Sequence, residues 1–110
     1  MKNDLVYLEQ IIDAVDKVKQ FTDGLNQEQF LADQKTQSAV IMQLVLIGEL
    51  AKRVSKETQS QILLPWKDIS GFRDRAIHDY YQIDLGIVWN TVISDLQILE
   101  ESLNEFLTKE

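Results

Sequence analysis

The residues best suited to chemistry lie in one short stretch of the chain, from Gly71 to Tyr81. This stretch holds two arginines, two aspartates, two tyrosines and the only histidine of the protein, His78. An arginine such as Arg73 binds phosphate oxygens through its planar fork of donors, and a histidine transfers protons near neutral pH. The stretch therefore suits acid–base chemistry at a phosphate group.

The same stretch also allows a purely structural interpretation. On a regular helix Asp74 and His78 are four residues apart, as are Arg75 and Asp79, so each pair shares one helix face. Two local pairs of this kind would stabilise a helix without any catalytic role. A lone histidine on a helix is also more often a surface residue than a catalyst, so spacing alone leaves both interpretations open.

The composition excludes several classes of site. The chain has no cysteine and one histidine, which excludes cysteine nucleophiles, zinc fingers, HExxH metal sites and the glutamate–histidine pairs of di-iron bundles. The four glycines are isolated from one another, so no GxGxxG or Walker-type phosphate loop is present. We therefore expect neither a metal nor a cofactor.

Charge is distributed unevenly along the chain. The net charge is −7, which argues against a protein that coats a nucleic acid, because clustered lysine and arginine drive phosphate binding. Residues 52–75 nevertheless carry six bases and three acids, so this segment is +3 and the remainder −10. The six bases of this candidate basic strip are Lys52, Arg53, Lys56, Lys67, Arg73 and Arg75. The alternative is that they are merely solvated helix faces.

Helices must position these residues, because apolar side chains recur with helical spacing and no strand is bounded by turn signals. The pattern predicts an all-α fold, an antiparallel bundle of four main helices plus one or two short helices, with residues 1–110 forming a single domain. The first main helix is expected to begin at an N-cap at Asp4 and to end near Gly24, and the second to run from a cap at Asp33 to about Val54. The third is expected over about Lys67–Tyr80, and the fourth begins at a cap at Asp84. Pro65 disfavours helix in the residue before it, so a helix break is expected before the third helix, and a short turn is expected at residues 26–31.

The second and the last of these helices have the clearest burial patterns. The second is apolar nearly all round, which predicts the most buried helix of the bundle. The last carries an apolar stripe of Val88, Val92, Leu96, Leu99, Leu103 and Phe106. The sequence shows no apolar signal segment and no run of about 18 apolar residues, so we expect a cytoplasmic protein without membrane contact.

Four residues separate Arg73 from His78, and one residue separates His78 from Tyr80. This spacing resembles the signature of HEPN domains, in particular that of the HepT-like toxins of toxin–antitoxin pairs. Four further segments look like the family pattern at similar separations: Gly48–Arg53, Leu64–Ile69, Gly71–Arg73 and Val88–Trp89. Together they cover about residues 1 to 107. The resemblance implies a HEPN-like helical bundle.

The resemblance also implies a metal-independent endoribonuclease, in which the RNA 2′-hydroxyl attacks its adjacent phosphate. This step needs a base for the hydroxyl, an acid for the leaving oxygen and a cation on the phosphorane. Arg73 is the candidate for charge stabilisation and His78 for proton transfer. One histidine does not readily serve as acid and base at once, so we expect a homodimer whose two motifs face each other across a cleft.

Tyr80 occupies the third motif position, to which the partner antitoxin of the HepT-like branch, an MntA-like minimal nucleotidyltransferase, would attach AMP in a type VII-like toxin–antitoxin system. A phosphodiester beside Arg73 would compete with the substrate phosphate. The alternative is that Tyr80 only packs. Glu49, Lys52 and Arg53 would line the cleft or support the motif, and Trp66 and Trp89 are assigned to the core or the dimer interface.

One position departs from the family pattern, because Asp74 follows the motif arginine where many members carry asparagine. Asp74 would either orient His78 through a hydrogen bond and favour its protonated form, or weaken the attraction of Arg73 for phosphate. Two other functions compete with the ribonuclease: a non-catalytic HEPN module that docks a nucleotide or a nucleotidyltransferase, and a purely structural bundle.

Overall fold

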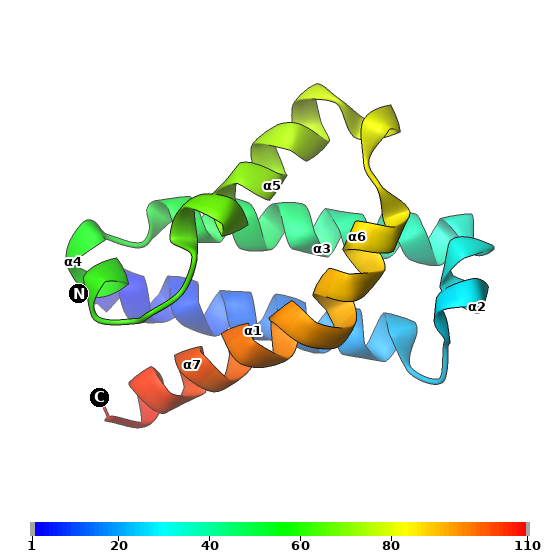
Figure 1. Cartoon of the computed structure of the whole chain (residues 1–110). Helices are drawn as coiled ribbons and strands as arrows, with labels where there is room; N and C mark the ends of the chain where they lie inside the picture. The colour runs from blue at the N-terminus through cyan, green and yellow to red at the C-terminus, as the bar shows by residue number, and fades with distance from the viewer. Residues whose placement is uncertain (1, 110) are drawn as a thin grey trace.

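The computed structural model describes residues 2–109, and within this range the chain is helical with no strand. The elements follow one another along the chain as α1 (Lys2–Thr22), α2 (Gln27–Leu31), α3 (Gln34–Arg53), α4 (Lys56–Ser60), α5 (Trp66–His78), the 3₁₀ turn η1 (Tyr80–Gln82), α6 (Leu85–Asn90), the π-helical turn η2 (Thr91–Asp95) and α7 (Leu96–Lys109). Figure 1 shows α1 and α3 lying along each other, α7 running beside α1, and α5 rising away from α3 toward its C-terminal end. The all-α prediction is confirmed.

Two of the predicted caps begin helices as expected. The Asp33 side chain accepts a hydrogen bond from the Thr36 backbone N–H at the start of α3, and Asp84 accepts from Gly86 and Ile87 at the start of α6. Each carboxylate satisfies N–H groups that have no partner within the helix. Helix α1 ends at Thr22, and the chain turns at Gly24. The φ of Gly24 is +77°, a backbone conformation that favours glycine.

The predicted role of Asp4 is wrong, because α1 already begins at Lys2 and Asp4 lies inside its first turn. The Asp4 side chain is 4% exposed and accepts hydrogen bonds from the Ser55 backbone N–H, the Ser55 hydroxyl and the Thr58 hydroxyl. Burial alone would raise the pKa of Asp4, but these hydrogen bonds outweigh it and lower the pKa. Asp4 thus joins the start of α1 to the loop that follows α3.

The core forms around α3, which packs against α1 on one side and α5 on the other. Its buried apolar residues are Val40, Ile41, Leu44, Ile47, Leu50 and Ala51, and full burial of one such aliphatic side chain contributes about 1.5–3 kcal/mol. The helix is not buried all round, since Met42 and Leu46 are exposed. Trp89 is buried against Phe30, with ring centroids 5.2 Å apart, so its assignment to the core is confirmed.

The third and fourth main helices differ in detail from their predicted form. Pro65 precedes α5, which starts at Trp66 and ends at His78, two residues earlier than expected. The Trp66 indole N–H donates to the carbonyls of Gln59 and Ile62, which fixes the partly buried ring at the entrance of the helix. The last helix is interrupted by the π-helical turn η2, which periodicity did not predict. Of its predicted stripe, Val88, Leu96, Leu99 and Leu103 are buried, and Val92 and Phe106 pack against the core.

Among residues 2–109, no helix has both the length and the apolar character needed to cross a membrane.

Candidate functional site

Arg73 lies in the middle of α5, on the side that faces α3. Its guanidinium contacts two carboxylates: Nε lies 3.0 Å from Oε2 of Glu49 on α3, and Nη1 donates to Oδ1 of Asp74 at 3.1 Å. The Arg73 side chain is 30% exposed, so it is partly accessible to solvent. Glu49 therefore supports the motif arginine directly, as one of the two sequence interpretations proposed.

Asp74 has a second partner on α3, because the Lys52 ammonium group donates to the same Oδ1 atom that binds Arg73. The hydrogen bond from Lys52, followed by that from Arg73, lowers the pKa of the Asp74 carboxyl group. Glu49, Lys52, Arg73 and Asp74 thus form one network of alternating charge, which we call the Arg73 network. Two charges of each sign make it neutral as a whole.

The interhelical contact beneath this network is close because residue 48 is a glycine. A Cβ atom on Gly48 would lie 2.7 Å from Cβ of Arg73 and 3.0 Å from the backbone oxygen of Ile69. No side chain fits between these atoms unless the helices move apart. Arg73 is therefore the residue of α5 that a side chain at position 48 would meet first.

His78 occupies the last turn of α5 and is exposed. It lines an open cavity of about 620 Å³ between α5, η1 and the start of α6, together with Asp79, Gln82 and Ile87. Five residues along a helix turn the side-chain direction by about 140°, so His78 and Arg73 of one chain point to different sides of α5. The structure places both on one helix without bringing them together.

The local pairs suggested by spacing are not formed. Within residues 2–109, no ion pair or hydrogen bond joins Asp74 to His78 or Arg75 to Asp79. The proposal that Asp74 orients His78 is therefore wrong in this structure, because the carboxylate already binds Lys52 and Arg73. The other interpretation remains, in which Asp74 reduces the charge that Arg73 offers to phosphate.

Tyr80 stands at the start of η1, directly after the α5 helix ends. Its side chain is 45% exposed, its hydroxyl lies 3.5 Å from the Ser38 hydroxyl of α3, and its ring meets Tyr81 edge-on. The hydroxyl is thus held at the surface, where another protein can reach it. Both predictions for Tyr80 are compatible with this position.

The basic strip is partly neutralised by neighbouring acids. Lys52 and Arg73 belong to the Arg73 network, and Arg53 lies 3.8 Å from Glu49. Within residues 2–109, Lys56, Lys67 and Arg75 form no ion pair. The strip is therefore less cationic than its composition suggests.

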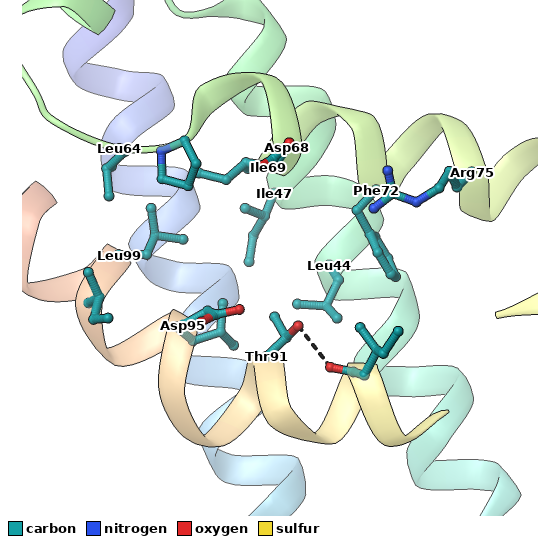
Figure 2. A pocket seen from close by; sticks show the side chains of 14 residues that line it. Leu44, Ile47, Leu64, Asp68, Ile69, Phe72, Arg75, Thr91, Asp95 and Leu99 are labelled. Atoms are coloured by element: carbon teal, nitrogen blue, oxygen red, sulfur yellow. Dashed lines mark hydrogen bonds between the residues drawn. The ribbon is translucent and has the colours of Figure 1, made fainter. Parts of the chain in front are cut away.

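A second hollow, whose lining Figure 2 shows, shares residues with the cavity of His78. It has a volume of about 390 Å³ and separates α5 from α6 and α7, with Leu44 and Ile47 of α3 at its floor. Phe72, Arg75 and Ile87 line both hollows, so the two form one trough along α5. The walls of the second hollow are mainly apolar, and Asp68, Arg75 and Asp95 supply its charges.

Residues 2–109 contain no group of three His, Asp or Glu side chains placed to hold a metal ion. The chemistry available at the site is that of Arg73, His78 and Tyr80, of which Arg73 alone is bound by the carboxylates of the Arg73 network.

The fold and site define an all-α bundle with an arginine, a histidine and a tyrosine on one helix and its following turn. A family model described as "Ribonuclease HepT-like" matches residues 11–106. "Putative RNase TTE0752" of Caldanaerobacter subterraneus subsp. tengcongensis is 33% identical over all of this chain and 99% of its own length. "Probable ribonuclease HepT" of Thermococcus cleftensis is 37% identical over 86% of each chain. The chain therefore belongs to the HepT-like ribonuclease family. No solved structure matches it.

Two residues of the site had no role assigned from the sequence. Gly48 belongs to a family-like segment, and the available signal is its type: a glycine inside an apolar helix costs about 1 kcal/mol relative to alanine, which indicates that another backbone packs closely there. Ser38 gave no signal at all, because nothing in its local sequence indicates that it lies beside Tyr80.

Proposed function

We propose that this protein is a metal-independent endoribonuclease that uses Arg73 and His78. The observation that supports the proposal is the position and the exposure of these two side chains. Arg73 is bound by two carboxylates at the α3–α5 contact with its side chain 30% exposed, and the only histidine of the sequence lines an open cavity on the same helix. Membership of the HepT-like ribonuclease family supports RNA as the substrate.

In the proposed reaction the RNA 2′-oxygen attacks the adjacent phosphorus and the bond from phosphorus to the 5′-oxygen breaks. A base removes the proton of the 2′-hydroxyl and an acid protonates the leaving 5′-oxygen, so the products are a cyclic phosphate and a 5′-hydroxyl. His78 transfers protons, and Arg73 stabilises the additional negative charge of the phosphorane. No oxidant and no metal-bound water is needed for this step.

The site is proposed to be composite, with Arg73 and His78 supplied by two chains of a homodimer. Within one chain the two side chains leave α5 in directions about 140° apart, and one imidazole does not readily serve as both base and acid. A two-fold axis at this face would bring the two Arg73 and the two His78 side chains of the dimer to one cleft, where the arginine of one chain can act with the histidine of the other.

A mixture of two inactive variants tests the composite site. Arg73→Ala and His78→Ala chains, unfolded and refolded together, should form mixed dimers in which one site has an intact arginine and an intact histidine. The mixed dimer holds one His78 instead of two, so such a mixture should recover cleavage that neither variant shows alone but should remain slower than wild type. Absence of recovery, with mixed dimers demonstrated by mass spectrometry, would show that both groups must come from one chain.

The proposed biological setting is a type VII-like toxin–antitoxin system. The protein would act as the toxin, and an MntA-like minimal nucleotidyltransferase would neutralise it by transferring AMP to Tyr80. The exposed hydroxyl at the end of α5 supports this proposal, since a bulky anion there would lie close to the helix that carries Arg73 and His78.

A non-catalytic binding module is the second candidate, and one observation favours it: both carboxylates near Arg73 reduce its attraction for phosphate. Purified wild-type protein and the Arg73→Ala and Lys17→Ala variants separate the two functions. The ribonuclease proposal expects the Arg73 variant to lose cleavage by about 10²–10³-fold, while the Lys17 variant, which lacks an exposed base of α1 outside the motif, cleaves like wild type. Absence of cleavage by correctly folded wild-type protein would favour the binding module.

A further inference from the structure

Two consecutive residues of α3, Gly48 and Glu49, contact Arg73 at its two ends. We infer that they are positioning residues for Arg73: Gly48 sets how close its backbone lies to α3, and Glu49 fixes the direction of its guanidinium. This inference rests on the proposed function for its effect on cleavage, although the positioning itself can be observed without RNA.

The contribution of Gly48 follows from the space at the helix contact. A Cβ atom at this position would be 2.7 Å from Cβ of Arg73, a distance that real Cβ atoms essentially never show. The other near atom is the backbone oxygen of Ile69, at 3.0 Å. Both belong to rigid parts of α5, so any side chain at residue 48 would displace the helix itself, and Arg73 is the residue it meets first.

The contribution of Glu49 concerns the other end of the same side chain. Its Oε2 atom lies 3.0 Å from Nε of Arg73, whereas Asp74 binds the guanidinium through Nη1. Two contacts at different nitrogens restrict rotation of the planar group more than either contact alone. Because Glu49 directly follows Gly48, one turn of α3 determines both the backbone position and the head-group direction of Arg73.

Gly71 of α5 provides a matched control for Gly48 of α3. It is also a helical glycine and lies two residues from Arg73, yet a Cβ atom there would meet only the flexible end of Arg75, at 3.3 Å. A substitution at Gly71 therefore changes helix propensity at a neighbouring position without pressing on α3.

The test uses the full chain with four variants: Gly48→Ala, Glu49→Gln, Gly71→Ala and Arg73→Ala. The first readout is the Nε–H resonance of Arg73 in a ¹⁵N NMR spectrum, assigned by its loss in Arg73→Ala. Glu49→Gln keeps the size of the side chain and removes its charge, so it remains informative if Gly48→Ala fails to fold. The second readout is kcat and KM for RNA cleavage.

We expect the Arg73 resonance to shift in Gly48→Ala and Glu49→Gln and to stay in place in Gly71→Ala. Cleavage by the first two should fall by up to about 100-fold, mainly in kcat, because a displacement near 1 Å in a reacting assembly costs about that much. An unchanged Arg73 resonance in both variants would overturn the positioning role. Full cleavage by Arg73→Ala would instead overturn the proposed function and leave the result on positioning intact.

Discussion

Asp74 of α5 accepts a hydrogen bond from Lys52 of α3, and this contact determines what the acidic residue after the motif arginine does. The same carboxylate oxygen binds Arg73, so the hydrogen bonds of Asp74 are made with Arg73 and with α3. Asp74 also lines the cavity of His78, but no hydrogen bond joins these two described residues. Asp74 thus acts as a partial counter-charge to the phosphate-binding candidate, and His78 remains exposed.

Removing this counter-charge should strengthen RNA binding. The Asp74→Asn variant keeps the size of the side chain but leaves Lys52 and Arg73 with less compensation, so we expect an affinity about fivefold higher for a non-cleavable RNA analogue and a steeper loss of affinity with salt. Fluorescence anisotropy at several salt concentrations measures both. Asp68→Asn, which removes an acid from the first turn of α5, serves as the control. Weaker binding by the Asp74 variant would show that Asp74 orients Arg73 more than it neutralises it.

Tyr80 should be the modified residue if a minimal nucleotidyltransferase is the partner. Incubation with such an enzyme and ATP should add the mass of one AMP group per chain to wild-type protein, and the modified protein should lose RNA cleavage. Tyr81→Phe should be modified like wild type, since Tyr81 is exposed but outside the motif position. Intact-mass spectrometry that finds AMP on Tyr80→Phe would contradict the assignment.

Asp4 should contribute measurably to stability although it lies far from the motif in sequence. Its replacement by alanine leaves the Ser55 N–H and the hydroxyls of Ser55 and Thr58 without their buried acceptor, which should cost about 1–3 kcal/mol in the free energy of unfolding. Urea denaturation measures the difference. Glu9→Ala, an exposed acid on the same helix, should change stability much less.

The contribution of Asp4 should also depend on pH in a defined direction. Its pKa in the folded protein lies below the ordinary value of 3.8, so the charged form is favoured by folding. The stabilisation is therefore fully present well above the ordinary pKa of 3.8 and is lost as the pH falls through the folded pKa. The difference between wild type and Asp4→Ala should shrink in that acid range, and a difference that grows there would contradict the account.

Much of the fold follows from local sequence rules. Asp33 and Asp84 cap the helices that they were expected to cap, because a carboxylate before an apolar repeat binds the free N–H groups of the first turn. The same rule failed at Asp4, where tertiary contacts with Ser55 and Thr58 determine the role of the carboxylate. Local rules do not describe a partner 51 residues away.

The candidate site was predictable in its residue types and only partly in its contacts. Spacing placed Arg73, His78 and Tyr80 on one helix and its end, and suggested that Asp74 would pair with His78. The crossing of α5 over α3 changed that outcome, because it brought Lys52 and Glu49 to the motif. The close contact at Gly48 depends on two helices at once, and so does not follow from the sequence of either.

Cleavage of RNA by purified protein in the presence of EDTA, with His78→Ala measured beside wild type, tests the central claim most directly. His78 is the only histidine, so no other imidazole can replace it. The account predicts that wild type cleaves equally well with and without EDTA and that the variant, still folded and of the same oligomeric state, is slower by about 10²–10⁴-fold. Cleavage by His78→Ala at the wild-type rate, or loss of wild-type cleavage in EDTA, would contradict it.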